Sequence, residues 1–294
     1  MSGLSGIVGE VDQLEQVLRH MSEAQNHRGR ETPVGWVSTF VDARVGLMHN
    51  RMNTIDPARA PSQPYEDADT GLVVMLDGEI FNYAEVRDQL ANYYTFATGC
   101  MCEVVAKAYD RWGDSSFDRF EGYFALVVYN RFSEELLLCR DRFGIKPLYY
   151  ATRWGNLYFA SEVRALFAGG VRPLLSAERW AGYLAYSTYG SPYETFWEGV
   201  HQLPAGFLLR YNGYSLVEKR WYELENRVEA WRNESPERRA EAFREQMRRS
   251  VGYSLMGEMP KGLSLDGGME SALFIALMKG TGTPRYLKLS LIHI

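Results

Sequence analysis

The second residue of the chain is the first that could do chemistry. The N-terminal stretch Met1–Gly9 has the sequence M-S-G-L-S-G-I-V-G, and Ser2 is small enough for the initiator methionine to be removed. Removal would leave a hydroxyl beside a free α-amino group, and an amine with a pKa of about 8 is a usable base for activating a nucleophile at neutral pH. The same stretch is apolar enough to be the start of an ordinary buried strand. The residues alone leave both interpretations open.

A glycine loop near the other end of the chain is the second group. The segment Asp266–Ser271, D-G-G-M-E-S, lies between a predicted strand, Gly262–Leu265, and a predicted apolar helix, Ala272–Met278. A strand, a glycine loop and a helix form the arrangement that binds phosphate groups at helix N-termini. Aspartate is also a good helix-capping residue. We favour capping over phosphate binding for Asp266.

The three cysteines predict neither a disulfide framework nor a metal site. Cys100, Cys102 and Cys139 are too few and too clustered, and no histidine stands at metal-ligand spacing from them. We expect Cys100 and Cys102 to be small residues that are buried or half-buried.

Composition excludes several classes of protein. The chain has 294 residues, of which 46% are hydrophobic, so it can bury a real core in one large or two ordinary domains. Its 37 acidic and 32 basic residues give a net charge of −5 without long blocks of one sign. No apolar run approaches the roughly 18 residues of a membrane span. We therefore expect a cytoplasmic, globular protein that acts on small molecules, with no nucleic-acid partner and no membrane.

The elements that must position these residues begin with a strand and a helix. Leu4–Val8 predicts a short buried strand, and apolar side chains from Leu14 to Met21 repeat at helical spacing. Aromatic and branched residues then predict a series of strands at Trp36–Val41, Leu72–Leu76, Tyr123–Tyr129, Leu136–Cys139, Leu148–Ala151 and Leu157–Ala160. Two predicted helices, Ala84–Ala91 and Cys102–Trp112, interrupt this region.

The chain changes character after two further predicted strands, Gly206–Tyr211 and Leu216–Tyr222. Residues 223–239 are highly charged and lose the apolar pattern, so we predict a linker there, between domains at 1–222 and 240–294. An open α/β domain is not complete with about two strands. We therefore expect the second domain to be truncated at its C-terminal side.

A series of short motifs, in order along nearly the whole chain, resembles the glutamine-dependent asparagine synthetases. Arg140–Tyr150, R-D-R-F-G-I-K-P-L-Y-Y, matches the family pattern R-D-x-x-G-I-K-P-L-Y without a break. The family patterns M-C-G-[IL]-x-G-[IV], H-R-G-P-D, L-x-H-x-R-L-x-I-x-D, N-G-E-I-Y-N, T-G-S-D-x-E, F-A-S-E and S-G-G-x-D-S are matched, in that order, by residues 1–8, 27–31, 47–56, 77–82, 98–103, 159–162 and 266–271.

The resemblance implies a fold and a reaction. The fold is α+β, an N-terminal-nucleophile hydrolase domain with a four-layer αββα sandwich, followed by a truncated α/β PP-loop domain. The reaction is the ATP-dependent transfer of the glutamine amide nitrogen to aspartate. Glutamine and aspartate would be the substrates, ATP and Mg²⁺ the cofactors, and a homodimer is one assembly that the resemblance allows.

The resemblance also implies a glutaminase site that is altered here. Ser2 replaces the cysteine that attacks glutamine with its own α-amine as base, and a hydroxyl depends on that base more than a thiol does. Asp77 replaces an asparagine that stabilises the oxyanion beside Gly78. An ionised aspartate has no donor and would reverse an effect typically worth about 3 kcal/mol. We predict weak or absent glutamine hydrolysis.

Positions that bind the substrate are changed in part. Arg51 matches the arginine that clamps the α-carboxylate of glutamine, and Glu79 is retained. Met101 replaces the aspartate that holds the α-ammonium group, and a thioether cannot pair a cation. Asp77 and Gly78 are also expected to form a hairpin turn.

The ATP-binding loop is altered as well. By resemblance its positions are Leu265, Asp266, Gly267, Gly268, Glu270 and Ser271. Asp266 stands where the family has a serine, and Glu270 where it has an aspartate. An extra carboxylate facing a phosphate is unfavourable unless a cation bridges the two, so we expect nucleotide binding to be impaired.

The altered positions are those committed to chemistry, whereas scaffold motifs such as Arg140–Tyr150 are intact. Three interpretations stay open. The first is an asparagine synthetase-like amidotransferase with impaired activity. The second is a non-catalytic paralogue with a binding or regulatory role. The third is a related PP-loop amide-forming synthetase, such as a β-lactam-forming one, in which the glutaminase site is dispensable.

Overall fold

The chain folds as two units that meet in sequence at Tyr222 and Glu223. The computed structural model describes residues 2–29, 34–39, 44–51, 63–188, 191–256, 261–265, 267–278 and 287–291.

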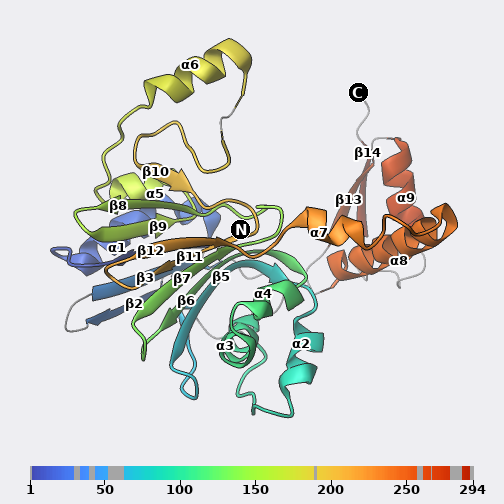
Figure 1. Cartoon of the computed structure of the whole chain (residues 1–294), viewed down its shortest axis with the longest axis horizontal. Helices are drawn as coiled ribbons and strands as arrows, with labels where there is room; N and C mark the ends of the chain where they lie inside the picture. The colour runs from blue at the N-terminus through green and yellow to red at the C-terminus, as the bar shows by residue number, and fades with distance from the viewer. Residues whose placement is uncertain are drawn as a thin grey trace. The chain divides into compact units, whose positions relative to one another are not determined.

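Two six-stranded antiparallel sheets form the N-terminal unit (Figure 1). The first has the order β10-β8-β9-β1-β3-β2, with β1 at Gly3–Val8, β2 at Val34–Thr39, β3 at Arg44–Asn50, β8 at Tyr149–Arg153, β9 at Asn156–Ala160 and β10 at Val200–Gln202. The second has the order β12-β11-β7-β6-β5-β4, with β4 at Tyr65–Glu66, β5 at Leu72–Ile80, β6 at Gly122–Asn130, β7 at Glu135–Arg140, β11 at Phe207–Tyr211 and β12 at Leu216–Arg220.

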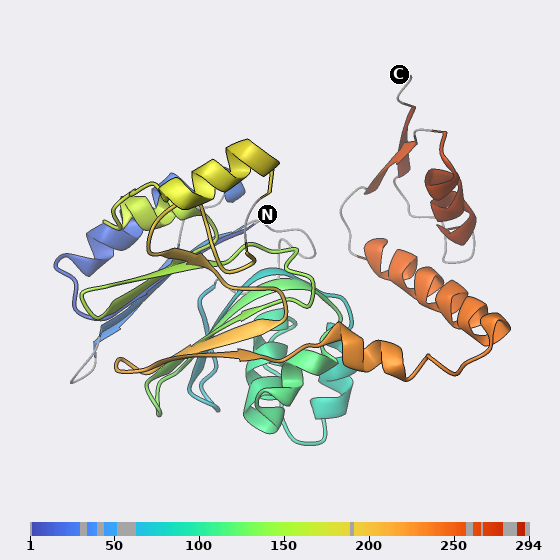
Figure 2. The same cartoon turned by 45° about the horizontal axis from the view of Figure 1, so that its top comes forward.

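Helices cover the outer face of each sheet (Figure 2). Helices α1, Leu14–Ala24, and α5, Val163–Ala168, pack on the first sheet. Helices α2, Tyr83–Leu90, α3, Met101–Trp112, and α4, Ser115–Arg119, lie on the second. The order helix, sheet, sheet, helix confirms the predicted α+β fold and its four layers. A further helix, α6 at Ala177–Tyr186, has no buried residue.

Strand β1 lies inside the first sheet and is buried along its whole length. Leu4 and Val8 belong to the core between the sheets, and Ile7 belongs to the core under the helices. A Cβ atom at Gly6 would lie 2.2 Å from the ring of Phe159, so only glycine fits there. The strand is therefore held from both sides, which fixes the position of the residue before it, Ser2.

Strand β3 is an element that the sequence pattern does not predict. It pairs with both β1 and β2 although Gly46, a residue that weakens strand propensity, stands near its start. A Cβ atom at Gly46 would lie 2.3 Å from Cδ1 of Leu18 in α1. The glycine is therefore explained by the close approach of the helix, which only the tertiary structure reveals.

Strand β5 is longer than predicted and contains no turn at Asp77 and Gly78. The hairpin turn expected there is wrong, because both residues lie inside β5 and pair with Ala125 and Phe124 of β6. Gly78 has a φ of +134°, and a Cβ atom on it would lie 2.0 Å from the carbonyl oxygen of Tyr123. A glycine is needed at this position because the neighbouring strand β6 approaches the backbone closely.

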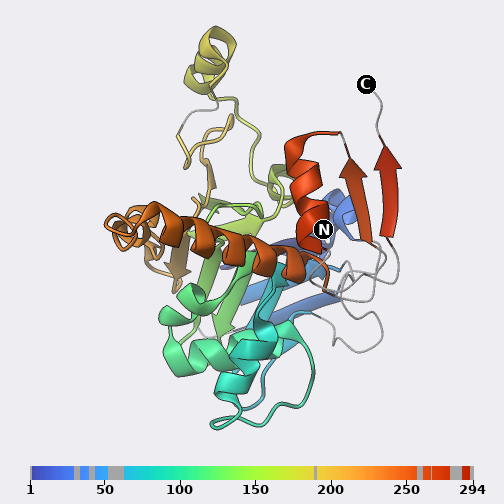
Figure 3. The same ribbon diagram turned by 90° about the vertical axis from the view of Figure 1, so that its right-hand side faces the viewer.

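The C-terminal unit contains helices α7, Leu224–Glu229, α8, Pro236–Ser254, and α9, Met269–Met278, with strands β13, Lys261–Leu265, and β14, Leu287–Leu291. The two strands are parallel, as Figure 3 shows. Helix α8 begins inside the predicted linker, because Ser235 caps it by accepting a hydrogen bond from the Arg238 N–H at 3.2 Å and Pro236 occupies its first turn.

Candidate functional site

The first predicted site forms where the start of β1 meets β5. The backbone N–H of Ser2 donates to Oδ1 of Asp77 at 3.0 Å, across 75 residues of sequence. The Asp77 side chain is completely buried, and Ser2 is 9% exposed. The structure therefore brings together the two residues that the sequence predicts for one catalytic pocket.

Two cations complete this cluster, and the sequence analysis does not single them out. Nη2 of Arg28 lies 2.8 Å from Oδ2 of Asp77, and Nζ of Lys146 lies 3.2 Å from Oδ1. Both cationic side chains are buried. Asp77 thus has three nitrogen donors, two of them charged, which suits an ionised carboxylate that can only accept.

Arg28 ties the cluster to β1 and to a second carboxylate. It belongs to the short 3₁₀ helix Asn26–Arg28 that follows α1, and its Nε donates to the carbonyl oxygen of Ser2 at 2.8 Å. Its Nη1 lies 3.3 Å from Oε1 of Glu162, which His27 also contacts at 2.7 Å. Both the N–H and the carbonyl of Ser2 are therefore held by side chains of the cluster.

The intact motif Arg140–Tyr150 positions Lys146. The carboxylate of Asp141 accepts from the backbone N–H groups of Phe143, Ile145 and Lys146 at 3.1, 3.0 and 2.9 Å. Arg140 donates to the carbonyl oxygens of Gly144, Lys146 and Leu203 at 2.7, 2.7 and 2.6 Å. These bonds fix the backbone of the loop. Lys146 and Arg28 both lie in motifs visible in the sequence, and their motif membership is the signal that could have found them.

Tyr123 connects Lys146 to the retained Glu79. The hydroxyl of Tyr123 donates to Oε2 of Glu79 at 3.2 Å, and Nζ of Lys146 lies 5.2 Å from the centre of the tyrosine ring. Burial, and then the negative charge of Glu79, raise the pKa of Tyr123 to about 12. The phenol therefore remains protonated at neutral pH and acts as a donor.

Met101 and Arg51 lie at the ends of elements near this cluster. Sδ of Met101, in the first turn of α3, accepts from the Ile80 N–H of β5 at 3.4 Å. Arg51 follows β3 and is half-buried. Burial, and to a smaller extent the charge of Arg51, lower the pKa of His49 to about 3.

The cysteines are buried, as predicted. Cys100 is the N-cap of α3, where its Sγ accepts from the Glu103 N–H at 3.3 Å. All three cysteines are free, and burial raises the thiol pKa of both Cys100 and Cys102. Such thiols are poor nucleophiles at neutral pH.

Two absences hold for the residues that the structure describes. No group of three or more histidine, cysteine, aspartate or glutamate side chains is placed to hold a metal ion. Among the described helices, none is both long enough and apolar enough to cross a membrane.

The second predicted site lies at the start of α9. The helix begins at Met269, three residues before the predicted start, so Glu270 lies exposed in its first turn. Gly267 has a φ of +81°, and Oγ of Ser271 donates to the carbonyl oxygen of Gly268 at 3.3 Å. Asp266 and the side chain of Leu265 lie outside the described residues.

The described part of this loop keeps the two glycines of the family pattern and has a carboxylate, Glu270, where the pattern has an aspartate. The carboxylate of Glu270 already complements the positive end of α9. The backbone of Gly267 and Gly268 is retained, but no step of a reaction is assigned to this loop.

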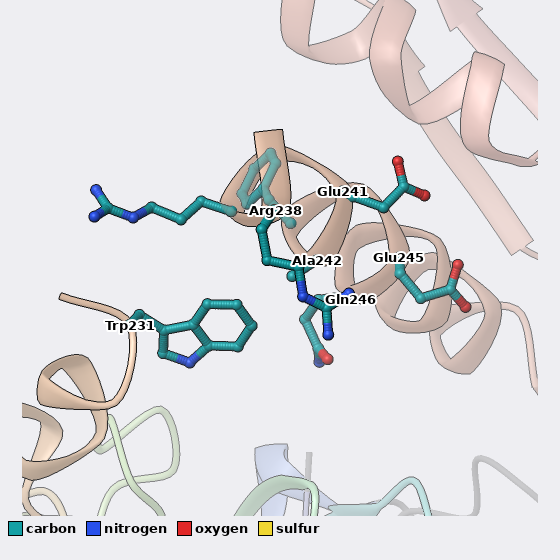
Figure 4. Close-up of a pocket in the computed structure, with 8 residues that line it drawn as sticks. Trp231, Arg238, Glu241, Ala242, Glu245 and Gln246 are labelled. Atoms are coloured by element: carbon teal, nitrogen blue, oxygen red, sulfur yellow. The ribbon is translucent and has the colours of Figure 1, made fainter. Parts of the chain in front are cut away.

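The C-terminal unit also contains an open hollow of about 850 Å³ beside α8 (Figure 4). Trp231 forms one wall, and Arg238, Glu241 and Glu245 are among the residues of the other. The lining mixes both signs of charge and contains no nucleophilic side chain. It therefore offers no chemistry of the kind predicted for either site.

Comparison with protein families gives one match to the N-terminal unit. Residues 1–222 match the model of a glutamine amidotransferase domain. Among curated proteins, the chain is 30% identical over 288 residues to asparagine synthetase [glutamine-hydrolyzing] 2 of Bacillus subtilis, covering 92% of this chain and 38% of the relative. It is 29% identical over 264 residues to the amidase chyE of Penicillium rubens, covering 89% of this chain and 38% of that protein.

Solved structures with the same fold are more distant in sequence. Glutamine phosphoribosylpyrophosphate amidotransferase from B. subtilis, in complex with ADP and GMP, aligns with a TM-score of 0.53 at 16% identity, covering 98% of this chain and 65% of the other. A structure described as the allosteric regulatory enzyme of purine biosynthesis gives 0.54 at 18% identity, covering 75% and 49%. These likenesses concern the fold alone. The chain spans 38% of the length of each of the two curated relatives described above.

Proposed function

Because the chain belongs to the glutamine amidotransferase domain family, we propose that it acts as an asparagine synthetase-like amidotransferase whose glutamine-hydrolysing step is strongly slowed. The parent reaction moves the amide nitrogen of glutamine to aspartate and consumes ATP with Mg²⁺. The observation that carries the proposal is the buried carboxylate of Asp77, which contacts Arg28, Lys146 and the nitrogen of Ser2.

The nitrogen of Ser2 is the first group affected. After removal of Met1 this nitrogen becomes an α-amine, which has to accept the proton of the Ser2 hydroxyl for the hydroxyl to attack an amide. It lies 3.0 Å from Oδ1 of Asp77. A carboxylate at that distance favours the ammonium form over the free amine. The nitrogen is therefore engaged with Asp77 and is less available to take up the hydroxyl proton.

The oxyanion is the second group affected. Attack on a glutamine amide places negative charge on the substrate oxygen, and Asp77 stands where the family has an amide donor. Loss of such a donor costs about 3 kcal/mol, or about 100-fold in rate. Arg28 and Lys146 offset the charge of Asp77, but the hydrogen bonds they make to it are not directed to a substrate oxygen. Hydrolysis is slowed through both the base and the oxyanion.

Recognition of glutamine is reduced but not abolished in this proposal. Arg51 would pair the α-carboxylate, and Glu79 would be the remaining carboxylate for the α-ammonium group. Met101 contributes only a thioether, and its sulfur already accepts from Ile80. At the second site the carboxylate of Asp266, which replaces the serine of the family pattern, weakens ATP binding. Glutamine thus binds more weakly than in a relative with the full set of charges.

The test is glutamate release from glutamine by protein whose methionine removal has been confirmed by mass spectrometry. We expect turnover at least 100-fold below that of an ordinary glutamine-hydrolysing synthetase. The variants are Ser2→Cys, Asp77→Asn and the triple variant S2C/D77N/M101D, with Asp88→Asn on the exposed face of α2 as a matched control.

Two results would decide against the proposal. Wild-type turnover close to that of an ordinary synthetase would show that the Asp77 cluster does not slow hydrolysis. If the triple variant folds and still releases no more glutamate than the wild type, the assignment of these three positions to one glutamine pocket is wrong. A gain in the triple variant but not in Asp88→Asn supports it.

A second candidate rests on the residues at positions 2, 77 and 101, which differ from the family's glutaminase pattern. It is a PP-loop amide-forming enzyme whose acceptor is not aspartate and whose glutaminase site is dispensable. Pyrophosphate release from ATP with ammonium chloride, measured with aspartate and with other carboxylic acids, separates the two. If no carboxylic acid supports pyrophosphate release while glutamine still binds, a non-catalytic binding role gains support.

A further inference from the structure

A hollow of about 480 Å³ lies at the end of β1 opposite Ser2. Residues that follow β1, Glu10 and Asp12, form one side of it, and the hairpin between β8 and β9 forms the other. At about 3.3 Å per residue, β1 separates this hollow from the Asp77 cluster by roughly 20 Å. Its volume lies in the range of small-molecule sites. It is therefore a second place in the same unit where a ligand fits.

Two carboxylates give this hollow its charge. Glu10 and Asp12 are both exposed, and within the described ranges of the chain neither has a cationic partner. No lysine, arginine or histidine lines the hollow. The nearest cation in sequence, Arg153, places its guanidinium 3.8 Å from the ring centre of Trp154. Arg153 therefore contacts the wall of the hollow at Trp154. Among the described residues it forms no ion pair with Glu10 or Asp12, and the lining residues themselves carry only negative charge.

Tyr158 is an independent observation that points to a ligand. It lines the hollow with only 5% of its surface exposed. Its hydroxyl has no hydrogen-bond partner in the part of the chain that the structure describes, and it is not among the polar atoms sealed from solvent. The hydroxyl of a tyrosine buried to this extent ordinarily has a partner, either a protein group or a water molecule. A polar atom supplied by a ligand in the hollow would satisfy this one.

The wall beside Tyr158 is rigid and carries an exposed indole. Asn156 holds Glu10 by two bonds, accepting from its N–H at 3.1 Å and donating to its carbonyl at 2.8 Å. A Cβ atom at Gly9 would lie 2.0 Å from Oδ1 of Asn156, so glycine is required there. The side chain of Trp154, in the hairpin turn, is 83% exposed. The hollow is therefore formed before any ligand arrives.

We propose that this hollow binds a small organic cation, an alkylammonium or guanidinium group on a short aliphatic chain. The carboxylates of Glu10 and Asp12 balance its charge and accept its N–H bonds. The Tyr158 oxygen accepts a further one. Arg153 covers one face of the exposed Trp154 ring, and the ligand would use the other. The site does not depend on the proposed glutaminase chemistry.

Isothermal titration calorimetry with defined probes tests the proposal. The probes are 1,4-diaminobutane for the ammonium group, agmatine for the guanidinium group, butane-1,4-diol as the neutral match and sodium chloride at equal ionic strength. We expect saturable binding of at least one of the two cationic probes and none of the diol. The difference between the two cations identifies the preferred head group. Saturable binding of the diol with an affinity like that of the cations, or no binding of either cation, would overturn the proposal.

Variants locate the binding in this hollow. The double variant E10Q/D12N should weaken binding at least tenfold, and Tyr158→Phe several-fold. Glu15→Gln, an exposed change on α1 outside the hollow, is the matched control and should leave affinity unchanged. If Tyr158→Phe fails to fold, E10Q/D12N still decides, because both of its positions are on the surface. Unchanged affinity in E10Q/D12N, or the same loss in Glu15→Gln, places the binding elsewhere.

Discussion

The two ends of β1 carry carboxylates in opposite situations. At the Ser2 end, Asp77 is completely buried and is contacted by two cations and a backbone N–H. At the other end, Glu10 and Asp12 are exposed, and the described residues supply them with no cation. A buried charge has to be neutralised within the protein. An exposed carboxylate is solvated by water and remains available to a ligand. The end of β1 at Ser2 and Asp77 is therefore the closed end, and the end at Glu10 and Asp12 is the open end.

At the closed end the residue at position 77 differs from the family pattern, whereas the surrounding cationic motif residues are retained. Arg28 and Lys146 lie in motifs that match the asparagine synthetase patterns, in which an amide stands at the position of Asp77. The aspartate therefore enters a place that already has two cations beside it, and its burial is compensated at once. The loop that holds Lys146 keeps its hydrogen bonds to Asp141 and Arg140.

Breaking the closed cluster should give the largest effect. Lys146→Met removes one partner of a buried carboxylate, and we expect the free energy of unfolding to fall by about 4 kcal/mol in urea titrations. The double variant K146M/D77N should recover at least half of that loss, since it removes the charge that was left unpaired.

An exposed ion pair serves as the control for that experiment. Lys219 lies 2.9 Å from Oδ2 of Asp114 and is 60% exposed, so Lys219→Met should cost about 1 kcal/mol or less. Equal losses in Lys146→Met and Lys219→Met would mean that burial adds nothing to the Asp77 cluster.

Disturbing the loop that positions Lys146 should have the next largest effect. Asp141→Asn replaces one acceptor oxygen with a donor that faces backbone N–H groups, and we expect a loss of about 3 kcal/mol in the free energy of unfolding. Measured by the same titration, a loss below about 1 kcal/mol would show that Asp141 does not hold the loop.

The buried side chain of His49 predicts that the free energy of unfolding depends on pH. Its pKa in the folded protein is about 3, below the ordinary value of 6.5. The unfolded chain therefore binds a proton that the folded chain does not, and stability falls as the pH drops from 6.5 towards 3. At about 1.4 kcal/mol per pH unit this amounts to about 2 kcal/mol at pH 5.

Histidine variants make that expectation specific. In His49→Gln the loss between pH 7 and pH 5 should shrink by about 2 kcal/mol. In His20→Gln, a change of an exposed histidine on α1, the loss should stay as in the wild type. An unchanged pH slope in His49→Gln would show that His49 does not carry this effect.

Substitutions at the open end should have the smallest effect on the free energy of unfolding. We expect E10Q/D12N to change the free energy of unfolding by no more than about 0.5 kcal/mol, because exposed groups without partners contribute little. Addition of 1,4-diaminobutane should raise the melting temperature of the wild type and leave that of E10Q/D12N unchanged. A double variant destabilised by more than about 2 kcal/mol would mean that the two carboxylates hold the fold together.

Much of the fold could be predicted because its strands and helices have strong periodic patterns. Strand β9 begins one residue before the predicted Leu157, and α3 one residue before the predicted Cys102. Strand β3 was not predicted because Gly46 interrupts the pattern of strand-forming residues. A glycine stands there because Leu18, in a helix packed on the strand, leaves no room for a Cβ atom. The local sequence does not show which glycines are required by contact with a residue far away along the chain.

The candidate site could be predicted in part. The proximity of Ser2 to Asp77 followed from motif positions, and the structure gives 3.0 Å. The roles of Arg28 and Lys146 were not predicted, because a motif shows that a residue is present without showing what its side chain contacts. Tyr158 and Trp154 were not predicted at all, since neither belongs to a motif and the hollow forms only when β1 and β9 pair.

The sequence by itself determined many of the elements of this protein, its membership of a family by motif order, and the chemical types at positions 2, 77 and 101. The tertiary structure decided the state of those groups. A side-chain carboxylate repels an oxyanion or neutralises a cation according to what lies within about 4 Å of it, because electrostatic interactions depend on distance and burial. Residues 2, 28, 77 and 146 are far apart along the chain, and only the pairing and packing of the two sheets bring them together.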